Sequence, residues 1–193
     1  MIRAAAAGHH VMRTLAITQN ITVDGAVEML DDWFDPADQA PDRAAHNAAL
    51  STRSDAILLG RQTFEDFRGY WPLQTDDTTG ITDELNRIDK YVVSSTLGDP
   101  GWKNSTVLGA DWRDRVRDLK AASGGEIVAT GSIRLCHALL ADDLVDEIRL
   151  YVFPAVQGRG RRLFPDGYVV EALRPLECTA FEGGARYLSY AVR

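Results

Sequence analysis

Short apolar segments of strand type alternate with segments of helix type through most of this chain, and this alternation limits the folds that it can adopt. The clearest apolar segments are AILLG (56–60), KYVVSS (90–95) and EIVATG (126–131). Each is short enough for a strand and apolar enough to be buried on both faces of a sheet. Helix-type segments follow at 63–71, 81–88, 111–123 and 132–143. This order predicts parallel strands joined by helical crossovers.

The flanking segments complete the expected fold. Residues 13–25 (RTLAITQNITVDG) predict a strand ending in an Asp-Gly turn, and 145–156 (VDEIRLYVFPAV) predict a long strand. Between them, residues 28–42 predict a loop or a short helical turn, and residues 42–55 predict a helix. Residues 176–192 predict a hairpin with Gly183 and Gly184 at its turn. We therefore expect an α/β fold: one mixed, predominantly parallel sheet with helices on both faces and an antiparallel C-terminal hairpin.

Charge and chain length exclude several classes of partner. The chain has 193 residues, a net charge of −7 and a pI near 5.1, which disfavours nucleic acid and anionic membranes as partners. No apolar run approaches the ~20 residues of a membrane helix. We expect residues 1–11 to be a disordered extension, an upstream start or a cloning remnant, and 12–193 to be one domain.

Neither the cysteines nor the histidines of the N-terminal segment predict a metal site. Cys136 and Cys178 show no Cys-x-x-Cys spacing, so we expect two buried thiols, which fits a reducing cytoplasm. His9 and His10 are adjacent, without a partner at metal-ligand spacing, and are interpreted as part of a solvated tail.

Three strand ends carry groups that suit a phosphate. They are Gly60-Arg61-Gln62-Thr63, Ser94-Ser95 and Gly131-Ser132. If the strands are parallel neighbours, these groups meet at one edge of the sheet. A helix that opens at Ser132 offers free N–H groups and roughly half a positive charge, and arginine matches phosphate oxygens with a planar fork.

Each fragment also has a plainer interpretation. Gly-Ser before a helix is more often only an N-cap, and Thr63 or a neighbour is expected to cap the helix at 63–71. Two serines after a strand are more often a turn, and a lone arginine after a glycine is more often a solvated surface group. Together and in this order, they favour a dinucleotide site. The Gly-x-Gly-x-x-Gly fingerprint of classical Rossmann folds is absent.

The segments LLGRQTFE, VVSS, GGEIVATGSIRL and DEIRLYVFPAVQGRGRRLF resemble the dihydrofolate-reductase-like superfamily over residues 13–193. The branch that they resemble most contains the reductase domain of the bifunctional riboflavin-biosynthesis deaminase-reductase and its stand-alone bacterial relatives. The resemblance implies NADPH as cofactor, with Arg61 at the 2′-phosphate. The other cofactor-binding residues that it implies are Gly60, Gln62, Thr63, Ser94, Ser95, Gly131, Ser132 and Ile133.

The same resemblance implies a substrate end near the first strand. Asp24, followed by Gly25, would bind substrate or deliver a proton, although Asp24-Gly25 is equally well a simple turn. Trp33 would cover the bound rings or is plain core. The acids Asp31, Asp32 and Asp35 lie in a proline-broken stretch, which disfavours true dihydrofolate reduction. In the 158–162 loop, Gly158, Gly160, Arg161 and Arg162 would contact an anionic substrate or are merely solvated.

The expected function is an NADPH-dependent oxidoreductase. It would transfer a hydride to a pterin-like or ribosylaminopyrimidine-like molecule, similar to 5-amino-6-(5-phosphoribosylamino)uracil reductase in riboflavin biosynthesis. The zinc-deaminase motif is absent, so only the reductive step is expected. The alternative is a non-catalytic nucleotide-binding or sensing module on the same fold. By analogy with relatives, we expect a cytoplasmic homodimer.

Overall fold

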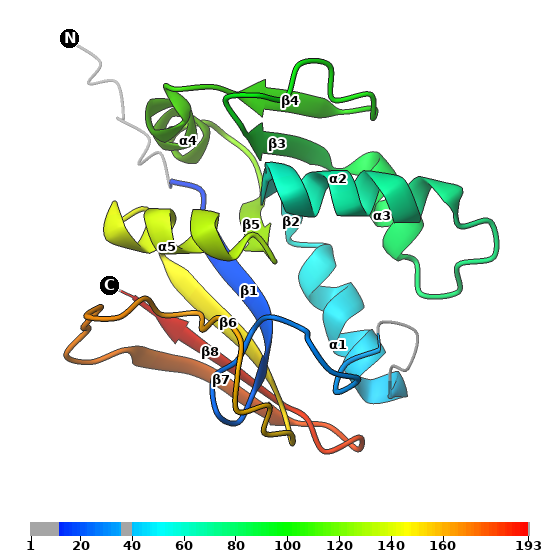
Figure 1. The fold of residues 1–193 in the computed structure, drawn as a ribbon, viewed down its shortest axis with the longest axis vertical. Coiled ribbons are helices and arrows are strands. Elements are labelled where there is room, and N and C mark those ends of the chain that lie inside the picture. The colour runs from blue at the N-terminus through cyan, green and yellow to red at the C-terminus, as the bar shows by residue number, and fades with distance from the viewer. Residues whose placement is uncertain (1–11, 36–39, 193) are drawn as a thin grey trace, which may run out of the picture.

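The computed structural model describes residues 12–35 and 40–192, so the expectation for residues 1–11 lies outside the described residues. Within these residues the chain forms one eight-stranded sheet in the order β4-β3-β2-β5-β1-β6-β8-β7. Figure 1 shows β4 and β3 near the top, β1 and β6 running through the middle, and β8 and β7 below. The strands are β1 (Leu15–Thr22), β2 (Ser54–Gly60), β3 (Asp89–Val93), β4 (Ser105–Leu108), β5 (Glu126–Thr130), β6 (Glu147–Phe153), β7 (Arg174–Ala180) and β8 (Arg186–Ala191).

Strand directions agree with the expected mixed sheet. Strands β1 to β6 pair in parallel, β8 pairs antiparallel with β6, and β7 pairs antiparallel with β8. The turn between β7 and β8 contains Gly183 and Gly184, as predicted. The predicted α/β fold with an antiparallel C-terminal hairpin is therefore confirmed.

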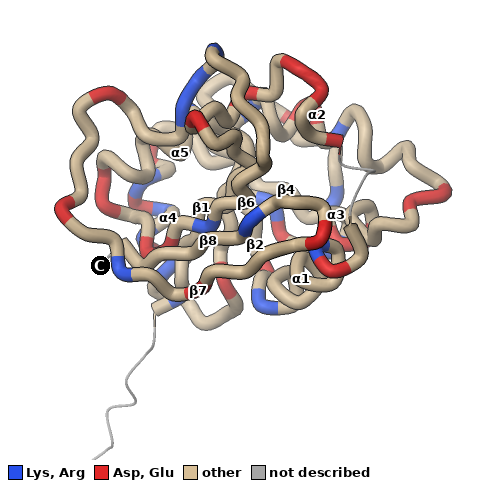
Figure 2. Tube along the Cα trace, turned by 90° about the horizontal axis from the view of Figure 1, so that it is seen from below, with Lys and Arg blue, Asp and Glu red and all other residues tan. Residues whose placement is uncertain are grey.

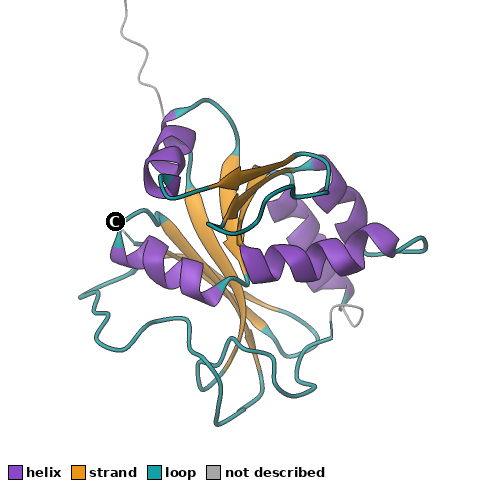
Figure 3. Ribbon diagram, turned by 45° about the horizontal axis from the view of Figure 1, so that its top comes forward, coloured by secondary structure: helices purple, strands orange, loops and turns teal. Residues whose placement is uncertain are grey.

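Helices cover both faces of the sheet, as Figure 3 shows. On one face, α4 (Trp112–Ala121) and α5 (Ile133–Ala141) bury Val116 and Leu139 against Ile17 and Leu58. On the other face, Phe64 of α2 (Arg61–Tyr70) and Leu85 of α3 (Ile81–Arg87) pack against β2 and β3. Here α1 (Pro41–Ser51) lies over the β6 and β8 aromatics, and a 3₁₀ turn (Trp71–Leu73) follows α2. No helix of the described residues is long and apolar enough to cross a membrane.

Three local expectations were incomplete or wrong. Strand β4 was not predicted, because its four residues contain a single buried side chain, Leu108, and carry little apolar signal. Helix α2 begins at Arg61 with Gly60 as its N-cap, and no side chain caps it, so Thr63 lies inside the first turn. Cys178 is exposed, not buried, because β7 is the edge strand and its side chains are mostly solvent-accessible.

The two cysteines should therefore differ sharply in reactivity. Burial raises the pKa of the Cys136 thiol to about 12, so it holds almost no thiolate near neutrality. A thiol reagent should modify Cys178 in the native protein and Cys136 only after unfolding. Counting modified thiols by mass before and after denaturant checks this, with Cys178→Ser as the control that removes native labelling. Modification of both thiols in the native protein would contradict the assigned burial.

Candidate functional site

The carboxyl ends of β3, β2 and β5 lie side by side at one edge of the sheet. Strand β2 is the middle strand: Gly60 is in register with Val93 of β3, and Leu58 with Ala129 of β5. The residues that follow these ends are those singled out in the sequence, namely Arg61, Ser94-Ser95 and Gly131-Ser132. The condition under which these groups meet at one edge, that their strands are parallel neighbours, is therefore met.

Two short loops at this edge are joined by direct hydrogen bonds. The Gly60 N–H donates to the Ser132 hydroxyl at 2.9 Å, and the Ser132 N–H donates to the Thr63 hydroxyl at 2.9 Å. Gly131 has a φ of +56°, and a Cβ there would lie 2.9 Å from the Thr63 methyl carbon. Glycine thus permits both the left-handed backbone and the close approach.

This connection brings the N-termini of α2 and α5 together at the centre of the molecule (Figure 1). No side chain caps either helix. The first-turn N–H groups of a helix have no intrahelical acceptor, and together with the helix dipole they attract anions. In the view of Figure 2, basic and acidic positions are interspersed over the chain.

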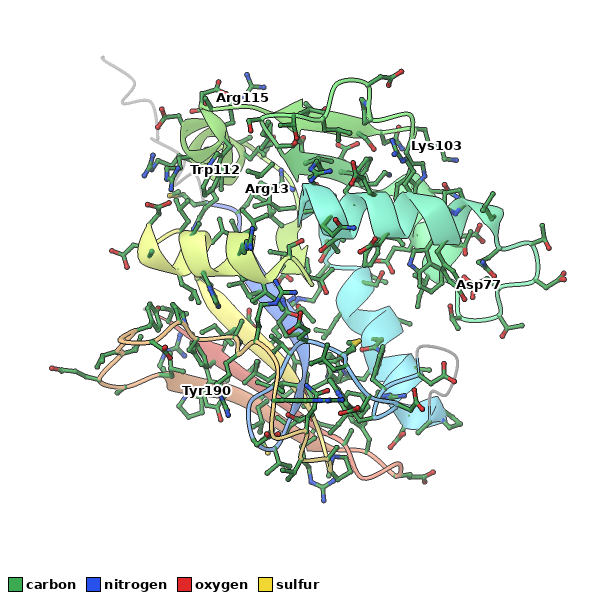
Figure 4. All side chains as sticks on the ribbon, in the orientation of Figure 1. Arg13, Asp77, Lys103, Trp112, Arg115 and Tyr190 are labelled. Atoms are coloured by element: carbon green, nitrogen blue, oxygen red, sulfur yellow. The ribbon has the colours of Figure 1, made fainter. Side chains whose placement is uncertain are left out.

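Arg61 lies between two cavities. The smaller, about 420 Å³, is lined by Arg61, Ser94 and Ser95, together with Val93, Thr96, Gly109, Ala110 and Trp112. Trp112, labelled in Figure 4, also lines the larger cavity, as does Arg61. The Arg61 guanidinium pairs with Glu65 one helical turn on, at 3.0 Å, and its side chain is 48% exposed. The Ser94 hydroxyl accepts the N–H groups of Thr96 and Leu97 and so shapes the turn that lines the small cavity.

The larger cavity is a cleft of about 1180 Å³ that runs from this edge toward α1. It contains the predicted residues Gly60, Gln62, Thr63, Gly131, Ser132 and Ile133. Sequence reasoning missed several polar and aromatic groups in its lining. Two of them lie at the Gly131 edge: Gln19 of β1, whose amide donates to the Gly131 carbonyl at 2.6 Å, and Arg134 in the first turn of α5. The others are Thr18 and Asn20 of β1, Glu28 and Phe34 of the loop before α1, Arg43 and Asn47 of α1, and Tyr151 of β6; the end of the cleft at α1 is called its far end.

A signal for some of these residues was present in the sequence. Arg43 and Asn47 are four residues apart on a helix and so share a face. Nothing in the sequence, however, indicates that this face of α1 lies over the cleft, because that depends on the packing of α1 against β6 and β8.

Asp24 takes a different place from the one expected. Its carboxylate accepts hydrogen bonds from the Thr22 hydroxyl at 2.6 Å and from the N–H groups of Gly158 at 2.8 Å and Gln157 at 3.1 Å. These bonds lower its pKa to about 2. Asp24 is not among the cleft-lining residues, and a group ionised at neutral pH holds no proton to give. This geometry favours a loop-organising carboxylate over the predicted proton donor.

Replacing Asp24 with asparagine should test this organising role. The folded-state pKa of about 2 lies below the usual aspartate value of 3.8, so the carboxylate stabilises the fold above about pH 4 and stops doing so as the pH falls toward 2. Asp24→Asn should lower the melting temperature at neutral pH, and the difference from wild type should shrink below about pH 4. Thermal unfolding of both proteins between about pH 2 and 7 measures this, and a pH-independent difference would contradict it.

The other predicted substrate residues are divided between the cleft and its surroundings. Arg161 lines the cleft and pairs with Glu28, and this hydrogen bond lowers the Glu28 pKa. Trp33 does not line it: its indole N–H donates to Gln157 at 2.7 Å and its ring packs on Phe34 and Phe153. Gly25 and Gly158 lie in the two loops that Asp24 joins, outside the cleft lining.

Comparisons with known proteins identify a family for this chain. The model of the RibD C-terminal domain matches residues 13–187. The uncharacterized protein YyaP of Bacillus subtilis is 27% identical over 180 residues, which are 92% of this chain and 94% of that protein.

Two solved structures share the fold at low identity. One is a protein from Shewanella sp. PV-4 whose name assigns it to riboflavin biosynthesis, with a TM-score of 0.72, 18% identity, and coverage of 92% of this chain and 98% of the other. The second is a pyrimidine reductase-like protein from Corynebacterium diphtheriae, with a TM-score of 0.67, 15% identity, and coverage of 94% and 92%. With a matching family model over most of its length, this chain belongs to the RibD C-terminal domain family.

Proposed function

We propose that this protein is an NADPH-dependent reductase that delivers a hydride to a C=N or C=O carbon of a ribosylaminopyrimidine-like or pterin-like molecule. Family membership supports a reductase-like role. The observation that carries the cofactor assignment is the adjacency of the two cavities, which share Arg61, Val93 and Trp112 in their linings. The smaller cavity adds Ser94 and Ser95, and the larger one passes two helix N-termini without a side-chain cap.

The donor set along this path fits a phosphorylated dinucleotide. Arg61, Ser94 and Ser95 would hold the 2′-phosphate, because a guanidinium and hydroxyls are ligands of phosphate oxygens. The first turns of α2 and α5 would hold the pyrophosphate. Gly131, where a side chain would fill the space between the loops, would let the backbone approach it closely. When bound, the cofactor supplies the hydride.

The far end of the cleft suits a planar, polar substrate. Phe34 offers an aromatic wall, and Thr18, Asn20 and Asn47 offer hydrogen-bonding groups that match the edges of a pyrimidine. Arg161 and Glu28 at the rim would contact an anionic substituent such as a phosphate. In this proposal the protein binds and orients the two reactants and supplies a proton, while the cofactor carries the electron pair.

Turnover by the purified protein tests the proposal. Oxidation of NADPH, followed at the nicotinamide absorbance band, is expected with at least one member of a panel of ribosylaminopyrimidines, aminopyrimidines and pterins. NADPH binding without turnover of any member would favour the alternative, a non-catalytic nucleotide-binding or sensing module. Failure to bind NADPH would contradict both.

A further inference from the structure

Gln19 of β1 is a buried polar side chain in the wall of the cleft, and its amide nitrogen faces the protein. The residue is 4% exposed and lines the cleft. Its Nε2 donates to the Gly131 carbonyl at 2.6 Å and lies 3.4 Å from the Cys136 sulfur. A peptide carbonyl can only accept, so the nitrogen of the amide, and not its oxygen, must face Gly131. This bond therefore fixes which way round the amide lies.

The peptide that Gln19 holds is the one at the start of α5. The Gly131 carbonyl also accepts the Cys136 S–H at 3.5 Å, and burial, which raises the pKa of Cys136 to about 12, keeps that proton in place. The Ser132 N–H of the same peptide donates to the Thr63 hydroxyl at 2.9 Å. Gly131 and Ser132 both have a positive φ, +56° and +43°. This strained peptide is held at both ends, so the amide that anchors it has little freedom to turn.

The oxygen of the same amide is the group that Gln19 presents to the cleft. Among the described residues no N–H or O–H group donates to Oε1, and Oε1 is not one of the fully buried side-chain atoms that lack a partner. An amide oxygen has two lone pairs and can only accept. The wall of the cleft therefore offers, at this point, a fixed acceptor for an N–H or O–H group of a bound molecule.

The alternation of side chains along β1 places Gln19 with the cofactor groups and not with the substrate groups. Successive residues of a strand point to opposite faces of the sheet. Gln19 contacts Cys136 of α5, whereas Thr18 lines a small cavity of about 150 Å³ with Asn47 of α1 and Tyr151 of β6. A nicotinamide that continues from a pyrophosphate at the α5 N-terminus toward the far end of the cleft would pass Gln19 before it met these groups.

We propose that Gln19 Oε1 accepts a hydrogen bond from the carboxamide NH₂ of the nicotinamide and so sets the rotation of that ring in the cleft. This inference rests on the proposed function, because it assigns a contact to the proposed cofactor. The carboxamide is the substituent of the nicotinamide ring that carries N–H donors, and Oε1 can only accept. A cofactor with a methyl ketone in place of the carboxamide has no donor there and leaves Oε1 without a partner. Gln19 is thus a specificity-determining residue of the cofactor site.

Affinities for two reduced cofactors test this contact without any turnover. The second cofactor is the acetylpyridine analogue of NADPH, in which a methyl ketone replaces the carboxamide. Wild type should bind NADPH roughly 3- to 10-fold more tightly than the analogue, the range that one ordinary hydrogen bond supplies. Gln19→Met keeps the length of the side chain but has no amide, so it should bring the two dissociation constants within about twofold of each other. Fluorescence titration measures both constants.

Thr63→Val is the matched control. It removes the hydroxyl that accepts the Ser132 N–H, and so loosens the same peptide from its other end, but it leaves the Gln19 oxygen in place. Both cofactors should weaken by the same factor in this variant, so the ratio of their affinities should keep its wild-type value. Gln19→Lys covers the case in which Gln19→Met does not fold. Its ammonium can still donate to the Gly131 carbonyl but has no acceptor atom, so the ratio should again fall to about one.

The outcomes separate this contact from the proposed function. If wild type binds NADPH and the analogue equally, or if the preference for NADPH survives in the Gln19 variants, the contact is refuted and the NADPH assignment stands. An equal loss of both cofactors in Gln19→Met also refutes it, because the side chain would then act only by holding the Gly131 peptide. If wild type binds neither cofactor, the proposed function fails and this contact fails with it.

Discussion

Replacing Arg61 with alanine should weaken NADPH binding by roughly 10- to 100-fold, the range expected for losing a charged hydrogen-bonding partner of a phosphate. NADH binding should change by no more than about threefold, because NADH carries a hydroxyl where NADPH carries the 2′-phosphate. Arg61 lines both cavities, and its ion pair with Glu65 holds the guanidinium at their junction. Fluorescence titration of wild type and variant with both cofactors measures the two losses.

Arg117 offers a matched control for this experiment. It forms an exposed ion pair with Asp114 on α4, at 2.9 Å, and does not line either cavity. Arg117→Ala therefore removes a helix-surface arginine of similar exposure and should leave both affinities unchanged. Equal losses for NADPH and NADH in Arg61→Ala would refute the 2′-phosphate assignment, since they would point to a general effect on the site.

Gly131→Ala should impair the site in a different way. The left-handed φ of +56° and the 2.9 Å approach of a new Cβ to the Thr63 methyl both oppose the substitution. We expect a loss of about 1–3 kcal/mol in the free energy of unfolding, the usual cost of a strained backbone position. Because separating the two loops disturbs both helix N-termini, NADPH and NADH should weaken by the same factor, leaving their ratio unchanged.

Chemical denaturation and cofactor titration check this expectation together. Gly69 of α2 serves as the control: a Cβ there would meet nothing within 4 Å, so Gly69→Ala should stabilise the helix by up to about 1 kcal/mol and leave binding unaffected. A Gly131→Ala protein with wild-type stability and affinity would contradict the close-packed loop. A selective loss of NADPH would instead place the 2′-phosphate near Gly131.

The cofactor edge could be predicted from the sequence because its residues follow directly on short buried strands. In a parallel sheet the carboxyl ends lie at one edge, so Gly60-Arg61, Ser94-Ser95 and Gly131-Ser132 were expected to meet if their strands are neighbours. The strand order of the structure supplies that condition. Their roles toward a cofactor stay predictions until binding is measured.

The far end of the cleft could not be predicted in this way. Arg43 and Asn47 of α1 and Tyr151 of β6 come together there because α1 packs against β6 and β8. Sequence periodicity shows which face of a helix is apolar, but it does not show which strand that face meets. Asp24 illustrates the same limit: its partners Gln157 and Gly158 lie more than a hundred residues away, and only their contact shows that the carboxylate is committed to the loops.

The insertion of β5 between β1 and β2 has a consequence for how the protein is made. Leu15 is paired with Ile127, and Leu58 with Ala129, so the two early strands meet only through a strand that is synthesised much later. A nascent chain that ends at α4 contains Arg61 and the two strands that flank β5, namely β1 and β2. It lacks β5 itself, Gly131, Ser132 and the N-terminus of α5. A ligand stabilises only the state that binds it. A bound ligand can therefore stabilise only chains in which β5 has been synthesised and has joined β1 and β2.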